Sequence, residues 1–141
     1  MAVSNHRRAT FLTKTEPGTY SFDDLEREGK TPWNGVRNPE ARKNLRAMRK
    51  GDQVLIYHSG KAPAIVGLAE VVKEAYPEPG AEEWSVVEVK PVRRFKRPVT
   101  LSELRELPEL SDWALLRRSR LSVVPVSPAQ LECVLKLEKS G

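Results

Sequence analysis

Three segments rich in β-branched residues lie close together in the middle of the chain, and they constrain its fold more than any other feature. Their sequences are QVLIYHS, AIVGLAEVV and WSVVEVKPVRRF, at residues 53–59, 64–72 and 84–95. Val, Ile and aromatic residues favour strands, and turn-forming residues separate the three segments. In the third segment Val87 and Val89 alternate with Glu88 and Lys90, which is typical of a strand with one buried face. The sequence therefore predicts a sheet at the centre of the fold.

Helix-start signals lie on both sides of these segments. Asn38-Pro39 combines a good N-cap residue with a proline at the first helical position. Ala41, Leu45 and Met48 then follow at helical spacing and are expected to face the core. Further helices are expected to begin at Ser21, Thr100 and Ser127-Pro128, and short strands are expected at residues 9–14 and 121–126.

The order of these elements is not a regular alternation of strands and helices. A strand, two helices, three strands, helices, a strand and a final helix favour an α+β fold. We expect a mixed, mostly antiparallel sheet that curls into a β-barrel surrounded by short helices. No internal repeat or linker divides the chain, so one domain is expected over residues 9–138. A disordered or extended N-terminal tail is expected at residues 1–8.

Composition narrows the class of protein. The chain has 141 residues, of which 39% are hydrophobic and 30% charged, as in a soluble globular domain. No apolar run approaches the roughly 18 residues of a membrane span, and the N-terminus lacks a secretory signal pattern. The single cysteine, Cys133, excludes an internal disulfide, suits a reducing cytoplasm and leaves little for a metal site. We therefore expect a cytoplasmic monomer with no cofactor, no metal and no membrane partner.

Basic residues are concentrated in three places. Residues 30–61 hold eight basic residues against two acidic ones, although the net charge of the whole chain is only +5. Smaller clusters follow at residues 93–97 (RRFKR) and 117–120 (RRSR). One such cluster is ordinary for a solvated surface, but three together favour a face that binds a polyanion, above all nucleic acid. The side chains expected to contact a nucleic-acid backbone are Arg42, Lys43, Arg46, Arg49 and Lys50.

Familiar catalytic motifs are absent from the sequence, including the P-loop, the dinucleotide fingerprint, the zinc-protease helix and the nucleophile elbow. His58 and Ser59 are neighbours in a predicted strand, so their side chains point to opposite faces and cannot act together as base and nucleophile. We interpret His58 as a strand histidine that lines a pocket or is satisfied in the core. Glu16 follows the first strand directly and has no evident structural role.

The stretch TPWNGVRNPEAR, residues 31–42, places Trp33 between turn-forming residues. A loop tryptophan can cover the edge of a core, and it can also form the wall of a binding site. An indole face stacks on nucleobases, and Asn34-Gly35 leaves backbone amides open to a ligand. Arg37 and the helix start at Asn38 add positive potential. This combination favours a pocket for one flipped base of a nucleic-acid strand.

Motifs spread along nearly the whole chain resemble those of the EVE domain family. They are KTEP, YSFDDL, TPWNGVRN, YHS, IVGLAEV and LRRSRLSV, at residues 14–17, 20–25, 31–38, 57–59, 65–71 and 116–123. EVE domains have a PUA-like fold and are related to YTH domains, which bind methylated adenine in RNA. The resemblance implies a PUA-like barrel and a non-catalytic reader of modified bases, above all modified cytosines, in DNA or RNA.

The resemblance also implies a set of binding residues. Trp33 corresponds to an aromatic wall of the base pocket, and the other implied positions line or flank it: Lys14, Thr15, Glu16, Asn34, Arg37, Asn38, Tyr57, His58, Ser59, Arg120, Leu121 and Ser122. Glu16 or Ser59 would bind the polar edge of the base. At Thr15 and Asn34 many family members have Ser and Asp instead. Tyr76 and Trp84 are the candidates for a second aromatic wall, although Trp84 is equally compatible with the core.

Two other functions stay open at this level. An enzyme that acts on a modified nucleobase or nucleotide would use Glu16 and His58 as acid and base. An adaptor would use the basic face to bind an acidic protein surface and would show no preference among bases. We rank the reader above the enzyme and the enzyme above the adaptor.

Overall fold

The structure is a computed structural model in which residues 8–140 are described. The tail expected at residues 1–8 lies outside this range, except for Arg8. The elements, in chain order, are β1 (Thr10–Thr15), α1 (Phe22–Glu28), β2 (Thr31–Trp33), α2 (Pro39–Arg46), β3 (Gln53–His58), β4 (Ala64–Glu78), β5 (Ala81–Thr100), α3 (Leu101–Arg105), the short 3-10 helix η1 (Pro108–Leu110), α4 (Ala114–Arg117), β6 (Val123–Val126) and α5 (Pro128–Lys139). The α+β class is confirmed.

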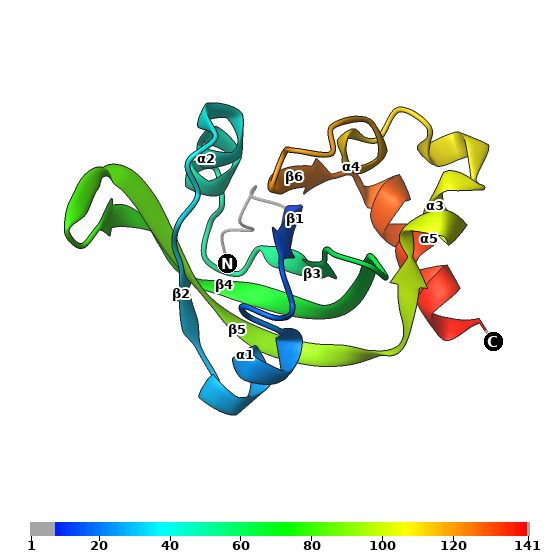
Figure 1. Cartoon of the computed structure of the whole chain (residues 1–141), viewed down its shortest axis with the longest axis horizontal. Coiled ribbons are helices and arrows are strands. Elements are labelled where there is room, and N and C mark those ends of the chain that lie inside the picture. Colours follow the sequence, from blue (N-terminus) through cyan, green and yellow to red (C-terminus); the bar gives the residue numbers. More distant parts are fainter. Residues whose placement is uncertain (1–7, 141) are drawn as a thin grey trace, which may run out of the picture.

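A single six-stranded sheet runs in the order β2-β5-β4-β3-β1-β6. β1 pairs with β3 in parallel, and the other neighbouring strands are antiparallel. Figure 1 shows that the sheet is strongly curved, but its edge strands β2 and β6 do not pair with each other within residues 8–140. The structure therefore has an open sheet where a barrel was expected. Pro32 and Pro125 lie in the edge strands, where the missing N–H limits further pairing.

The contact between α1 and the sheet fixes the loop that joins β1 to α1. Ser21 caps the helix with a capping box, as expected. Phe22 is fully buried, and its ring lies so close to Gly67 of β4 that a Cβ atom there would be 2.6 Å from the ring. The Arg94 guanidinium lies 5.2 Å from the Phe22 ring centroid and forms ion pairs with acidic side chains of α1. Only glycine fits beneath this ring without a rearrangement.

The sequence signals for α2 are confirmed. The Asn38 side chain accepts hydrogen bonds from the backbone amides of Glu40 and Ala41, so it caps the helix. Ala41, Leu45 and Met48 are buried in the core against β5 and β6. The helix therefore presents Lys43 and Arg46 to solvent, whereas Arg42 is half-buried.

The β4–β5 hairpin is longer than the sequence predicts, with strands of 15 and 20 residues. Its outer part pairs Tyr76 with Val86 and Pro77 with Ser85, and it projects beyond the rest of the sheet (Figure 1). The segment KEAYPEPGAEE, residues 73–83, contains charged residues and prolines that disfavour strands. Pairing between the two strands extends the hairpin despite this weak local propensity.

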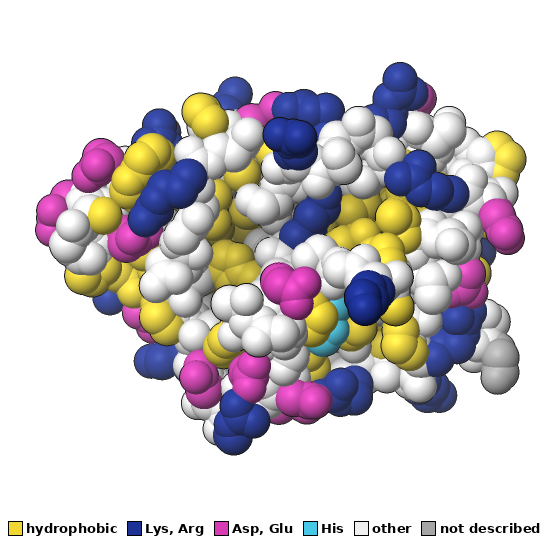
Figure 2. Space-filling view, in the orientation of Figure 1, with side chains coloured by type: hydrophobic (Ala, Val, Ile, Leu, Met, Phe, Trp, Pro, Cys, Tyr) yellow, Lys and Arg dark blue, Asp and Glu magenta, His cyan; other side chains and the backbone are white. Residues whose placement is uncertain are grey.

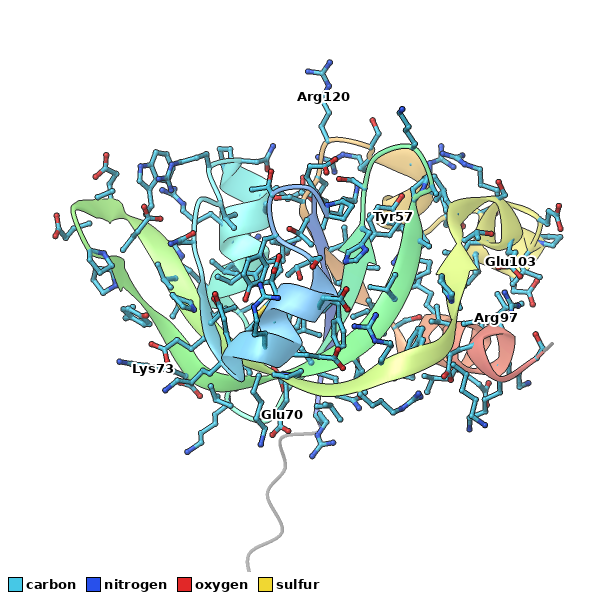
Figure 3. All side chains as sticks on the ribbon, turned by 60° about the horizontal axis from the view of Figure 1, so that its bottom comes forward. Tyr57, Glu70, Lys73, Arg97, Glu103 and Arg120 are labelled. Atoms are coloured by element: carbon cyan, nitrogen blue, oxygen red, sulfur yellow. The ribbon has the colours of Figure 1, made fainter. Side chains whose placement is uncertain are left out.

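Ion pairs attach α3 and α5 to β5. Arg93 donates two hydrogen bonds to the fully buried Glu138 of α5, at 2.8 and 3.2 Å. Arg97 donates to both carboxylate oxygens of Glu103 in α3, at 3.0 and 2.7 Å. Figure 3 shows Arg97 and Glu103 side by side where β5 ends, next to α5. The basic cluster at residues 93–97 thus has acidic partners within the protein.

Candidate functional site

A hollow of about 400 Å³ lies between the end of β1 and β2. Figure 2 shows that this face is hollowed between the two strands and that hydrophobic side chains are visible inside. The volume is within the range of small-ligand pockets. The hollow is lined by Lys14, Thr15, Thr19, Tyr20, Thr31, Pro32, Trp33 and Asn34.

Two aromatic rings form the apolar part of this pocket. Trp33 is half-buried, and its ring lies edge-to-face with Tyr20, with ring centroids 6.1 Å apart and planes at 87°. Burial raises the pKa of the Tyr20 phenol to about 12, and its hydroxyl donates to Glu28 at 2.7 Å. Trp33 was expected in a loop, but it is the last residue of β2 and pairs with Val87 of β5. This strand pairing fixes the position of the indole ring in the pocket.

Tyr20 is the aromatic partner that the sequence did not identify. Its motif, YSFDDL, was recognised, but only the turn between β1 and α1 brings the ring to Trp33. The two candidates for a second wall lie elsewhere. Tyr76 lies on the β4–β5 hairpin, where its hydroxyl donates a hydrogen bond to Glu88 at 2.8 Å. The Trp84 ring lies under the guanidinium groups of Arg37 and Arg42. Neither of these rings lines the hollow.

Polar groups at the mouth of the pocket come from both sides. The Lys14 ammonium donates to the backbone carbonyls of Arg118 and Ser119, at 3.4 and 3.1 Å, and burial lowers its pKa. The Thr15 hydroxyl donates to the Tyr20 carbonyl at 2.8 Å. Asn34 is exposed at the rim. Lys14 and Asn34 therefore supply a donor and an amide within reach of a ligand.

The two groups of the candidate acid–base pair are each bonded to the backbone. The Glu16 carboxylate accepts from the Gly18 amide at 2.6 Å. Nε2 of His58 accepts from the Phe22 amide at 3.0 Å, at the start of α1. Burial lowers the pKa of His58, so the ring is neutral at pH 7. His58 is thus satisfied within the fold, one of the two roles expected for a strand histidine.

The remaining positions of the implied set lie around the pocket rather than in its lining. Tyr57 is buried, with Lys14 above its ring at 5.8 Å, and Ser59 donates its amide and hydroxyl to the Thr15 carbonyl. Leu121 is a core residue. The Ser122 carbonyl accepts from the Lys14 amide, and Figure 3 shows Arg120 extended away from the body of the protein. These residues support β1, except for Arg120.

Arg37 and Arg42 contact the β4–β5 hairpin. Their guanidinium carbons lie 4.9 and 5.1 Å from the Trp84 ring centroid. Arg37 also donates to Glu78 at 3.0 and 2.9 Å, and Arg42 donates to the Glu83 carbonyl at 3.0 Å. The start of α2 was expected to attract phosphate, but the Asn38 side chain already occupies two of its amides.

Four further basic side chains lie on α2 or directly after it, and their surroundings differ from those of Arg37 and Arg42. Lys43, Arg46, Arg49 and Lys50 are exposed and form no ion pair within residues 8–140. The loop at residues 117–120 joins this surface, because Arg118 pairs with Glu40 of α2 at 2.6 Å. The side chain of Lys14 links the same loop to the pocket. The cluster at residues 117–120 is therefore joined to the hollow through Lys14 and to α2 through Glu40.

Residues 8–140 contain no group of three His, Cys, Asp or Glu side chains that could hold a metal ion. No helix in this part of the chain has the length and apolar character that crossing a membrane requires.

Known proteins resemble this chain along most of its length. Human thymocyte nuclear protein 1 is 36% identical over 165 residues, which cover 92% of this chain and 73% of the relative. The structure of human THYN1 protein in complex with DNA containing 5-methylcytosine has a TM-score of 0.87 and 34% identity, covering 94% of this chain and 99% of that chain. A hypothetical protein from Leishmania major has a TM-score of 0.88 and 39% identity, covering 94% and 96%.

The names of the vertebrate relatives overturn the cytoplasmic assignment. The human and mouse proteins are both called thymocyte nuclear protein 1, so the expected location is wrong by this comparison. The physical reason is that a lone cysteine indicates only a reducing environment, which the nucleus shares with the cytosol.

The family model agrees with these similarities. The model of the EVE domain matches residues 9–137, which includes every strand, the whole pocket lining and the exposed bases of α2. The match extends over far more than half of the chain. The chain therefore belongs to the EVE domain family.

Proposed function

We propose that this protein is a non-catalytic reader that binds DNA and accommodates one flipped 5-methylcytosine in the hollow beside Trp33. The observation that carries the proposal is the pairing of Trp33 and Tyr20 in an open pocket of about 400 Å³. A family member of similar fold, human THYN1, was solved with DNA containing 5-methylcytosine, which supports this choice of ligand. The methyl group adds apolar surface to the base, and the two rings provide apolar surface to receive it.

The polar edge of the base would be bound by Lys14 and Asn34. Cytosine offers an amino donor and ring acceptors. The Asn34 amide oxygen can accept from the amino group, and the Lys14 ammonium can donate to an acceptor of the ring. Glu16 and Ser59 were expected in this role, but the Glu16 carboxylate holds the Gly18 amide and the Ser59 hydroxyl holds the Thr15 carbonyl. Neither side chain lines the hollow.

The phosphate backbone would be held next to the pocket by the exposed cations of the α2 surface. Within residues 8–140 no acidic side chain forms an ion pair with any of these four cations, which are Lys43, Arg46, Arg49 and Lys50. Their charges are therefore available to bind phosphates. A single chain contains every residue of the pocket lining, and we therefore propose a monomer as the binding unit. RNA with the same modified base remains within the proposal.

No catalytic role is assigned to Glu16 or His58. A general base needs a free acceptor directed at the substrate. Nε2 of His58 accepts the Phe22 amide, so this nitrogen is not free to take a proton from a ligand. Glu16 is exposed and does not line the hollow, so it is not directed at a base bound there. Incubation with a labelled oligonucleotide is expected to return it unchanged, and any product would favour the enzyme instead.

Titration with matched oligonucleotides tests the reader. We would compare plain cytosine, 5-methylcytosine, 5-hydroxymethylcytosine and N6-methyladenine in DNA and in RNA, at low and high salt. Trp33→Ala is expected to weaken binding of the preferred strand by roughly 1–3 kcal/mol, the usual value of base stacking on an aromatic ring. Trp33→Phe keeps a ring and should retain most of the preference. Equal binding of every strand by the parent protein would refute a base-reading pocket.

A further inference from the structure

One carboxylate holds the outer end of the β4–β5 hairpin against the segment that follows Trp33. Glu78, the last residue of β4, accepts the Gly35 amide at 3.3 Å and two guanidinium N–H groups of Arg37 at 3.0 and 2.9 Å. Only 13% of the Glu78 side chain is exposed. Figure 1 shows the hairpin reaching across to the segment between β2 and α2.

The groups around this carboxylate form a typical binding site for an oxyanion. A guanidinium fork matches two oxygens of a carboxylate or of a phosphate equally well. The Gly35 amide adds a third donor, and its φ of 78° is a left-handed conformation that favours glycine. Trp84 lies 4.9 Å from the Arg37 guanidinium and keeps it in place. The donor set would therefore persist if the carboxylate left.

The position of this site relates it to the pocket. Asn34 lines the hollow, and Gly35 is the next residue along the chain. The start of α2, a further source of amide donors, is already capped by the side chain of Asn38. A nucleotide whose base stacks on Trp33 carries its phosphate one sugar away from that base. Within the described residues, the hydrogen-bond donors that follow the pocket along the chain are the Gly35 amide and the Arg37 guanidinium, and both donate to Glu78.

We propose that Gly35 and Arg37 form a phosphodiester subsite that Glu78 occupies in the free protein and that a nucleic-acid phosphate takes over on binding. The proposal rests on the reader function, because it places the phosphate of the flipped nucleotide. Glu78 competes with phosphate for the same donors, so it lowers the affinity for any strand. A strand whose base fills the pocket gains enough to displace the carboxylate, whereas a strand held only by its backbone does not.

Glu78→Gln separates charge from shape at this site. The amide keeps the size and the acceptor oxygen of the side chain but no longer competes as an anion. Glu82→Gln is the matched control, because it removes one negative charge from the same hairpin. Among the described residues, the Glu82 carboxylate accepts a hydrogen bond only from the nearby Gly80 amide. Each variant would be titrated with plain and 5-methylcytosine DNA over a range of salt concentrations, and thermal melting would verify the fold.

The expected result is tighter binding of plain DNA by Glu78→Gln, by roughly threefold to tenfold at low salt, with little change in Glu82→Gln. The plot of log affinity against log salt should become steeper, by up to about 0.9 for one phosphate contact. The advantage of 5-methylcytosine over cytosine should shrink. Unchanged or weaker binding by Glu78→Gln would overturn the subsite and leave Glu78 as a structural contact.

A second pair of variants covers the case in which Glu78→Gln disturbs the hairpin. Arg37→Gln removes the phosphate ligand and should weaken binding of 5-methylcytosine DNA. Adding Glu78→Gln to it should then give no gain in the binding of plain DNA. A gain in the double variant equal to that in the single variant would mean that Glu78 acts through general charge, and the subsite would be wrong. Failure of the reader function looks different, because the parent protein would then bind plain and modified DNA equally.

Discussion

Two basic clusters look alike in the sequence and differ in the folded protein. We call Arg93, Arg94, Lys96 and Arg97 the β5 cluster, and Lys43, Arg46, Arg49 and Lys50 the α2 cluster. Each arginine of the β5 cluster has an acidic partner, whereas no member of the α2 cluster has one within residues 8–140. The β5 cluster therefore attaches helices to the sheet, and the side chains of the α2 cluster are exposed to solvent.

The difference shows what a local charge count can and cannot predict. Three basic clusters favoured a nucleic-acid surface, but the β5 cluster has acidic partners in other elements. The partners in α1 and α5 are 68 and 45 positions away in the sequence, and the partner in α3 is six positions away. A paired cation loses most of its field at the surface, because the nearby carboxylate cancels it. The cluster at residues 117–120 is intermediate, since Arg118 pairs with Glu40 and Arg120 is exposed. The polyanion-facing surface is thus smaller than the sequence indicated.

The largest effect is expected from breaking the buried pair of the β5 cluster. Arg93→Met leaves the Glu138 carboxylate, whose side chain is 0% exposed, with the Lys96 amide as its one hydrogen-bond donor among residues 8–140. Removing one partner of a buried ion pair is strongly destabilising, here by about 3 kcal/mol in the free energy of unfolding. Urea denaturation measures the change. Lys90→Met, at an exposed position of the same strand, is the control and should stay within about 0.5 kcal/mol.

The same variant tests whether the β5 cluster contributes to binding. Nucleic-acid affinity of folded Arg93→Met should equal that of the parent protein. If the variant lost affinity but not stability, Arg93 would belong to the nucleic-acid interface and the role assigned to the β5 cluster would be wrong.

A smaller effect of the opposite kind is expected in the α2 cluster. Lys43→Ala with Arg46→Ala should weaken binding of every oligonucleotide, modified or not, by roughly tenfold at low salt. The slope of log affinity against log salt should become shallower, by an amount that corresponds to the loss of up to about two phosphate contacts. The ratio of the affinities for modified and plain DNA should be retained. Stability should change little because both side chains are exposed. Retained affinity would remove the α2 cluster from the interface.

The smallest effect concerns acid stability, and it concerns the pair of Arg97 and Glu103 in the β5 cluster. Arg97 and the Thr100 amide lower the pKa of Glu103 to about 2, from an ordinary value of 4.5. Because the folded pKa is the lower one, this stabilisation is complete above pH 4.5 and is lost as the pH falls from 4.5 towards 2. Urea unfolding at intervals across this range should show a shallower fall in Arg97→Gln than in the parent. Parallel curves would show that the pair does not contribute.

Much of the fold could be predicted because its signals are local. The caps at Ser21, Asn38, Thr100 and Ser127 each start a helix, since the capping side chain and the amides it binds lie within three residues. The alternation of Val87 and Val89 gave a strand with the correct buried face. The outer half of the β4–β5 hairpin could not be predicted, because pairing between strands outweighs its prolines and charges.

The candidate site was predictable only in part. Trp33 was singled out from its neighbours, but its place in β2 depends on pairing with Val87 of β5, which lies more than fifty residues further along the chain. Tyr20 reaches Trp33 through the turn after β1, and no spacing rule connects the two. Arg42 was expected at the nucleic-acid backbone, but it is half-buried over Trp84. The proposed roles of the implied binding residues remain predictions for the titrations above.

By itself, the sequence determined the helix starts, the central strands, the family and the presence of one unusual tryptophan. Each of these depends on residues a few positions apart or on motifs read in order. Tertiary structure alone decided which cations have an acidic partner, which ring contacts Trp33 and which carboxylate accepts the hydrogen bonds of Gly35 and Arg37. These outcomes depend on side chains that meet only after the sheet has formed, and electrostatic interactions are strong only across such short distances.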